Sequence, residues 1–106
     1  MKIVKGQTER HEFTITNDEG VFDLTGSTAR LVIADRAGTV FYEVSKTSFT
    51  APTTGVVTFT IPKATTAAFT TGRAKMQIDI LNTSAEIDYS EVFPAQVIEP
   101  IDYDTP

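Results

Sequence analysis

The chain contains one histidine, His11, and no cysteine, so few residues are available for histidine- or thiol-based chemistry. His11 begins the stretch HEF, which lacks the second histidine of the HExxH pattern that binds zinc on a helix. Its neighbours Phe13 and Ile15 alternate with polar residues, which indicates a strand instead. No serine lies in a G-x-S-x-G motif, in which a sharp turn exposes the nucleophile. We therefore expect a structural or surface histidine and no enzymatic activity.

Acidic residues are the other candidates for chemistry, either as acid–base pairs or as calcium ligands. Glu86 and Asp88 lie beside a turn signal, where acids are expected for local reasons. A second cluster of oxygen-bearing residues lacks the alternate spacing of a calcium-binding loop; it consists of Asn17, Asp18, Glu19 and Asp23. The six glycines are dispersed and form no phosphate-binding loop. We predict solvated turns at these positions, and neither a metal nor a cofactor.

The formal net charge of −5 at pH 7 is distributed unevenly. Residues 1–75 carry all nine lysines and arginines together with seven acids, whereas residues 76–106 carry seven acids and no basic side chain. Nucleic-acid binding needs clustered basic side chains, so we expect no nucleic-acid partner. The acidic last third is either a solvated face that aids solubility or a surface that orients a basic partner.

The chain shows no signal for a membrane or for export. No apolar run approaches the roughly 20 residues that span a bilayer, and the start MKIVKGQTER lacks the apolar region of a secretory signal. We therefore expect a soluble chain without a membrane partner. Because it has no cysteine, its stability must come from packing.

Apolar and polar residues alternate along most of the chain, and helical periodicity is almost absent. The expected strands cover 12–16, 27–35, 40–44, 56–61, 73–81 and 85–98. Pro94 interrupts the last strand and, because proline donates no backbone hydrogen bond, it belongs at an edge or a bulge. Residues 62–69 alone have helical character and predict a short crossover between sheets, with Pro62 at the first helical position.

These elements predict an all-β fold: an immunoglobulin-like antiparallel β-sandwich of about seven strands with one short crossover helix. Residues 1–98 are expected to form a single domain. Residues 99–106 contain two prolines and three acids, and we interpret them as an acidic tail or a linker stump.

The strand at 27–35 has apolar residues on both faces. One face enters the expected core, which leaves Val32 and Ala34 outside, and we expect Val21 and Phe22 of the preceding corner to join them. The strip is compatible with an ordinary exposed surface and with a partner surface. Acidic residues near the end of the chain complete the candidate partner-binding set: Glu99, Asp102 and Asp104.

Three short marks, in this order, carry a resemblance to a known family: Asp23-Leu24-Thr25-Gly26, Gly55-Val56-Val57 and Thr71-Gly72. Together with the stretches FDLTGSTARLVIADRAGTVFYEV, GVVTFTIP and TTGRAKMQIDIL, the chain from about Lys5 to Ile98 resembles the N-terminal domain of phage baseplate upper proteins, a β-sandwich of siphophage tail tips. The family commonly has an aromatic residue where this chain has Ala74. Its members usually continue into a region that carries receptor-binding components, so this chain would be a standalone subunit or part of a longer protein.

The resemblance implies a virion structural protein that is made in the host cytoplasm and built into the phage tail. It would dock receptor-binding or adhesion components onto the tail hub, contact other baseplate proteins and assemble as a homo-oligomer, without catalysis. The alternative is a carbohydrate-binding sandwich that recognises host cell-wall polysaccharide, for which Phe41, Phe49 and Tyr89 are the aromatic residues expected outside the core. A third interpretation is an immunoglobulin-like module with no activity of its own.

Overall fold

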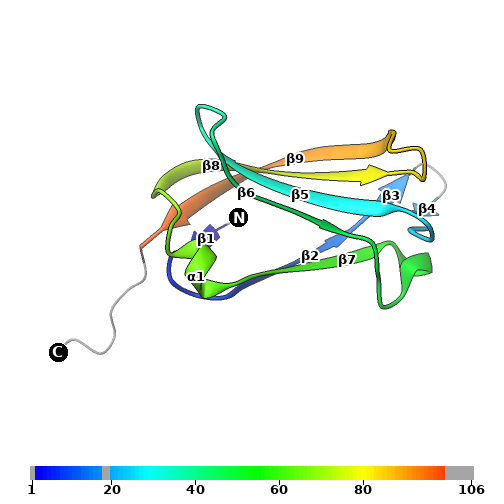
Figure 1. Ribbon diagram of the computed structural model, residues 1–106, viewed down its shortest axis with the longest axis horizontal. Coiled ribbons are helices and arrows are strands. Elements are labelled where there is room, and N and C mark those ends of the chain that lie inside the picture. Colours follow the sequence, from blue (N-terminus) through cyan, green and yellow to red (C-terminus); the bar gives the residue numbers. More distant parts are fainter. Residues whose placement is uncertain (1, 18–19, 100–106) are drawn as a thin grey trace.

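A computed structural model describes residues 2–17 and 20–99, which fold into two facing layers of strands (Figure 1). The larger layer is a five-stranded sheet in the order β1–β9–β8–β5–β6. Its strands are β1 (Lys2–Val4), β5 (Thr28–Asp35), β6 (Val40–Lys46), β8 (Gly72–Leu81) and β9 (Ile87–Ile98). The smaller layer is the ladder of β2 (Glu9–Thr14) with β7 (Val56–Ile61), followed by the short pair β3 (Thr16–Asn17) and β4 (Gly20–Val21). The predicted all-β sandwich is confirmed.

The core lies between the layers and is built from every second residue of the strands, because successive side chains of a strand point to opposite faces. Burying a side chain of the size of Leu31 stabilises the fold by roughly 1.5–3 kcal/mol, so these inner faces hold the layers together. The residues predicted to face inward from β5, β7 and β8 are all buried: Ala29, Leu31, Ile33, Val57, Phe59, Ile61, Ala74, Met76, Ile78 and Ile80.

The pairing of β1 with β9 is parallel, whereas every other strand pairing among the described residues is antiparallel. The purely antiparallel arrangement expected from the sequence was therefore wrong at this edge. Three residues are too few to show an alternating pattern, and only Ile3 of β1 enters the core. For the same reason, the two-residue strands β3 and β4 could not be recognised as strands.

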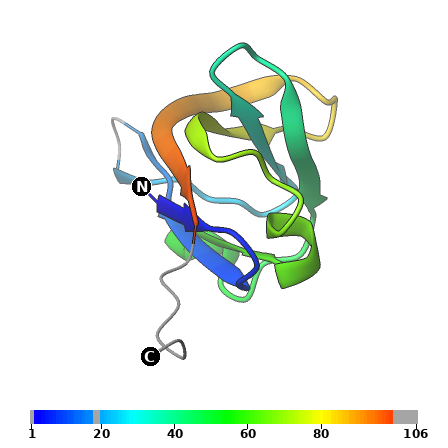
Figure 2. The same ribbon diagram turned by 90° about the vertical axis from the view of Figure 1, so that its left-hand side faces the viewer.

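Strand β9 bends along its length. Figure 2 shows it curving down to β1, the edge strand of the same five-stranded sheet, which lies beside the smaller layer. Strand β9 pairs with β1 only from Gln96 onward, where Gln96 pairs with Lys2. On its other side, Pro94 pairs with Lys75 of β8. Pro94 therefore lies where β9 is an edge strand, as its missing backbone N–H predicts.

Helix α1 (Lys63–Thr66) connects the smaller layer to the larger one, which confirms the predicted crossover. Pro62 is extended and caps the helix, so its expected place inside the first turn was wrong by one residue. Thr66 is fully buried, and its Oγ1 donates a hydrogen bond of 2.7 Å to the carbonyl oxygen of Gln7. The crossover is thereby fixed to the turn that joins β1 to β2.

Gly55 joins the β2–β7 ladder to the β3–β4 pair, directly after the short 3-10 helix η1 (Pro52–Thr54). Its backbone has a φ of +72°, and a Cβ atom at this position would lie 2.5 Å from the carbonyl oxygen of Ile15. The N–H of Ile15 donates to the Gly55 carbonyl at 2.7 Å, and the N–H of Phe22 donates to the Ile15 carbonyl at 2.9 Å. Only glycine satisfies both the conformation and the close approach.

Candidate interaction surfaces

An apolar patch, here called the outer patch, lies on the face of the five-stranded sheet that points away from the core. Strand pairing aligns Val32 with Val92 across Gln77, and aligns Ala34 with Val40. The side chains of Val40 and Val92 are exposed, with 52% and 55% of their residue surface accessible. The outer patch consists of residues from β5, β6 and β9: Val32, Ala34, Val40, Val92 and Pro94.

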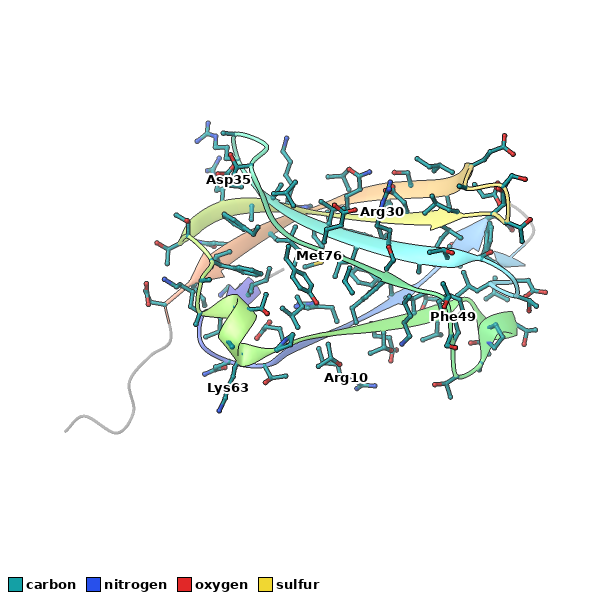
Figure 3. All side chains as sticks on the ribbon, in the orientation of Figure 1. Arg10, Arg30, Asp35, Phe49, Lys63 and Met76 are labelled. Carbon is teal, nitrogen blue, oxygen red and sulfur yellow. The ribbon has the colours of Figure 1, made fainter. Side chains whose placement is uncertain are left out.

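A polar cluster borders the outer patch and links three strands of the same sheet. Asp79 of β8 is fully buried although it points to the outer face, because its neighbours cover it. Its Oδ2 accepts hydrogen bonds from Arg30 Nη2 at 2.7 Å and Arg30 Nε at 3.2 Å, and its Oδ1 accepts from Ser90 Oγ at 2.6 Å and Gln77 Nε2 at 2.9 Å. Figure 3 shows Arg30 on the outer side of this sheet and Met76 between the layers.

The charge state of Asp79 follows from this cluster. Burial of Asp79 opposes its ionisation and is the largest single influence on its pKa. The hydrogen bonds from Gln77, Ser90 and Arg30, together with the positive charge of Arg30, outweigh burial and lower the pKa of Asp79. A carboxylate held by three strands keeps the sheet beside the outer patch in one register.

The structure brings together only part of the predicted partner-binding set. Val32 and Ala34 lie in the outer patch, whereas Val21 is exposed on β4, which pairs with β3 and is not part of this sheet. Phe22 packs against the core. Glu99 is exposed beyond the end of β9, where its Oε1 lies 3.6 Å from Lys5 Nζ. The other two acids of the predicted set, Asp102 and Asp104, lie outside the described residues.

Two exposed valines of the outer patch were missed by the sequence reasoning. The alternation of β9 contained a signal, since Val92 has the opposite parity to the buried Ala95 and Val97. The β5–β6 pairing shifts register after Ile33, so that Val40 pairs with Ala34 on the outer face. This bulge could not be read from the sequence of β6, and it determines which face Val40 occupies.

The single histidine lies on the inner side of β2, opposite buried Phe59, and only 12% of its side chain is exposed. His11 Nε2 lies 3.2 Å from Glu9 Oε1, but the two atoms are not aligned as a hydrogen bond. Within residues 2–17 and 20–99, no serine hydroxyl is hydrogen-bonded to His11. The geometry around His11 fits a structural position at the edge of the core.

The acidic candidates make local contacts in turns. Asp23 Oδ1 accepts hydrogen bonds from the backbone N–H and the hydroxyl of Thr25, and these bonds lower the pKa of Asp23. Glu86 and Asp88 both lie near the amide of Asn82 in the β8–β9 turn. In the part of the chain that the structure describes, no group of three or more His, Cys, Asp or Glu side chains could hold a metal ion. Asp18 and Glu19, which the sequence grouped with Asn17 and Asp23 as possible calcium ligands, lie outside that part.

The aromatic residues expected outside the core do not form an open platform. Phe41, Phe49 and Tyr89 are all partly buried and pack against the core cluster. Phe41 stacks on buried Phe69 with ring centroids 5.3 Å apart. A sugar ring needs an exposed aromatic face, so this placement removes the main structural support for a carbohydrate site.

A groove, here called the edge groove, separates β2 and the following residues from the first half of β9. It has a volume of about 400 Å³. Phe13 and Phe93 contact each other beneath it, with ring centroids 5.5 Å apart. The residues that line the edge groove are Glu12, Phe13, Thr14, Ile15, Thr16, Tyr89, Glu91 and Phe93.

Tyr89 and Glu91 are coupled at the mouth of the edge groove, where the Tyr89 hydroxyl donates a hydrogen bond to Glu91 Oε2. Burial raises the pKa of Tyr89, and the hydrogen bond and negative charge of Glu91 raise it further, to about 12. Tyr89 is therefore neutral at physiological pH and remains a hydrogen-bond donor.

Among the described residues, no helix has the length and apolar character needed to cross a bilayer. Comparison of the sequence with protein-family models and with curated proteins gives no match.

Proposed function

We propose that this chain is a non-enzymatic structural module that docks onto a hub protein in a phage tail baseplate and places adhesion components there. The proposal joins the resemblance carried by the three sequence marks to the surface properties of the sandwich. It places the working protein in the virion, after synthesis in the host cytoplasm, and assigns its partners among other tail proteins and further copies of the chain.

The outer patch is the observation that carries the proposal. Val40 and Val92 are more than half exposed on one face of the sheet; Val32 and Ala34 lie between them on β5, and Gln77 of β8 separates Val32 from Val92. Exposed apolar side chains on a rigid sheet, interspersed with polar ones, have the composition of a protein-contact surface. The Asp79 cluster holds the strands beneath it in register, so the patch presents a fixed shape to a partner.

The marks that carry the resemblance occupy positions with a structural reason. Gly55 closes the junction between β2–β7 and β3–β4, and Asp23 caps the turn before β5 through its bonds to Thr25. Gly72 begins β8 with a φ of +127°. These roles support a sandwich with this order of turns, and the assignment to a baseplate then depends on the resemblance.

Co-purification with the proteins encoded by the genes adjacent to that of this chain tests the proposal. We expect the wild-type chain to elute with a hub protein, and Val92→Glu to abolish the complex because it places a charge within an apolar contact. Val21→Glu is the matched control, since Val21 is equally exposed but lies on β4. Failure of the wild-type chain to bind any of these proteins would refute the function.

A second outcome tests the surface separately from the function. If the wild-type chain binds and Val92→Glu binds equally well, docking occurs elsewhere and the outer patch is not the contact. Saturable binding of host cell-wall polysaccharide by the isolated chain would favour the carbohydrate-binding alternative instead.

A further inference from the structure

The edge groove lies between two strand edges that have no partner within the described residues. Strand β2 pairs with β7 on one side only, and residues 87–95 of β9 pair only with β8. An unpaired edge presents a row of backbone donors and acceptors, which is a template for an additional strand.

The backbone of β2 is oriented for such an addition. Ile15 directs its N–H to Gly55 and its C=O to Phe22, both on the side of β7 and β4. Because alternate residues of a strand direct these groups to opposite sides, Glu12 and Thr14 direct theirs toward the open edge. These groups are available to an extended segment that enters the edge groove.

The side chains of the edge groove define what kind of segment fits. Phe13 and Phe93 supply an apolar floor, which suits the aliphatic part of a long side chain. Glu91 pairs in register with buried Ile78, so it belongs to the inner face of β9 yet remains exposed at the mouth of the groove. Glu12 adds a second carboxylate, and the described lining contains no basic side chain.

We infer that the edge groove binds an extended, basic segment of a partner protein by strand addition along β2. A lysine or arginine of that segment lies over Phe13 and Phe93 and forms an ion pair with Glu91 at the mouth. The inference rests on the proposed function in one respect, namely that the partner is a protein of the same assembly. It names a second contact, separate from the outer patch.

Charge selects this occupant over a second copy of the chain. Two copies meeting at this edge would bring Glu12 and Glu91 of one copy toward the same carboxylates of the other, which is unfavourable for like charges facing across strands. A basic segment removes the repulsion and forms a charge-assisted hydrogen bond instead. The hydrogen bond from the Tyr89 hydroxyl holds the Glu91 carboxylate in place for this contact.

Nuclear magnetic resonance titration of the full chain tests the inference, with a proline-free synthetic peptide that alternates lysine with threonine and valine as the probe. We expect saturable shifts of the amides of Glu12, Thr14 and Phe93. Glu91→Gln should weaken binding about tenfold, the loss expected for one charge-assisted contact. The control Glu43→Gln removes the same charge from the outer side of β6 and should bind like the wild-type chain.

Two altered probes separate strand addition from simple charge attraction. The same peptide with every backbone nitrogen methylated keeps its charge but cannot donate a ladder hydrogen bond from either edge, so it should lose binding to the edge groove. The peptide with glutamate in place of lysine should not bind. Equal binding of the methylated peptide, or equal weakening by Glu91→Gln and Glu43→Gln, would overturn the inference.

The remaining outcomes distinguish this contact from the proposed function. Val92→Glu should bind the peptide normally, because the outer patch is on the other face of the sheet. If the chain dimerises through the edge groove, or if no peptide shifts these amides while hub binding persists, strand addition is wrong and docking by the outer patch still stands.

Discussion

Replacement of Gly55 by alanine should destabilise the protein far more than its small size suggests. The added Cβ would lie 2.5 Å from the Ile15 carbonyl oxygen and 3.1 Å from the Phe22 carbonyl oxygen. Both carbonyl oxygens are backbone atoms, which cannot rotate away as a side chain can. The strand junction must open to relieve the contact, and the bond from the Ile15 N–H to the Gly55 carbonyl is then lost.

The expected magnitude is a sum of two parts. A left-handed conformation costs a residue with a Cβ roughly 1–2 kcal/mol. The lost backbone hydrogen bond and the displaced junction add about 2 kcal/mol, because a buried backbone group is left unpaired. A total of roughly 3–4 kcal/mol is a large fraction of the 5–15 kcal/mol that stabilises a typical domain.

Gly6→Ala is the matched control for Gly55→Ala. Gly6 has a φ of +75°, close to the +72° of Gly55, but a Cβ at this position would meet no atom within 4 Å. It should therefore lose only the conformational part, about 1–2 kcal/mol. Urea denaturation followed by circular dichroism measures both free energies of unfolding, since the chain lacks tryptophan as a fluorescent probe. Equal losses for the two variants would refute the steric reasoning.

Three further predictions concern single contacts. Asp79→Asn should lower the free energy of unfolding by roughly 2–3 kcal/mol at neutral pH. Because the pKa of Asp79 is lowered from 3.8 in the folded protein, the stability that its carboxylate contributes is present above that value and lost as the pH falls. Urea denaturation should therefore show the difference in free energy of unfolding between wild type and Asp79→Asn shrinking in acid. Ultraviolet titration should show Tyr89 ionising near the pKa of about 12 in the wild-type chain and at lower pH in Glu91→Gln, but still above 10.0, because burial is the largest cause of the raised pKa and remains in the variant. Because the folded pKa is raised, the stability that Tyr89 contributes is present below 10.0 and lost as the pH rises through about 12; an unchanged Tyr89 titration in the variant would contradict the coupling. Thr66→Val keeps the shape of the side chain but removes the bond to Gln7, and thermal unfolding should detect a loss of about 1–2 kcal/mol, whereas a neutral effect would mean that packing alone fixes the crossover.

Alternation in the sequence predicted the two-layer fold because it reports directly which side chains are buried. The inner faces of β5, β7 and β8 each contain at least three apolar residues at alternate positions. Only one facing of these strands buries all of these side chains together. Strand β1 escaped prediction because its three residues contribute one buried side chain, Ile3, and its parallel pairing with β9 depends on how β9 bends.

The candidate surfaces were only partly predictable, because they depend on register between strands far apart in the sequence. Val32 could be assigned to an outer face from β5 alone, but its alignment with Val92 required the pairing of β5, β8 and β9. Asp79 is one of the seven acids of residues 76–106, which the sequence left open between a solvated face and a partner surface; its burial follows from Arg30 and Ser90 on the neighbouring strands. The edge groove has no signal in any single strand, since it forms where two strand edges meet that have no partner among residues 2–17 and 20–99.

Hydrogen exchange of the chain, alone and mixed with the hub protein that it captures, tests the docking function most directly. The account predicts that binding slows exchange of backbone amides in the segments beneath the outer patch, 30–34 of β5 and 90–93 of β9, and leaves β4 unchanged. Protection confined to β4, or a complex with no added protection in β5 and β9, would contradict it.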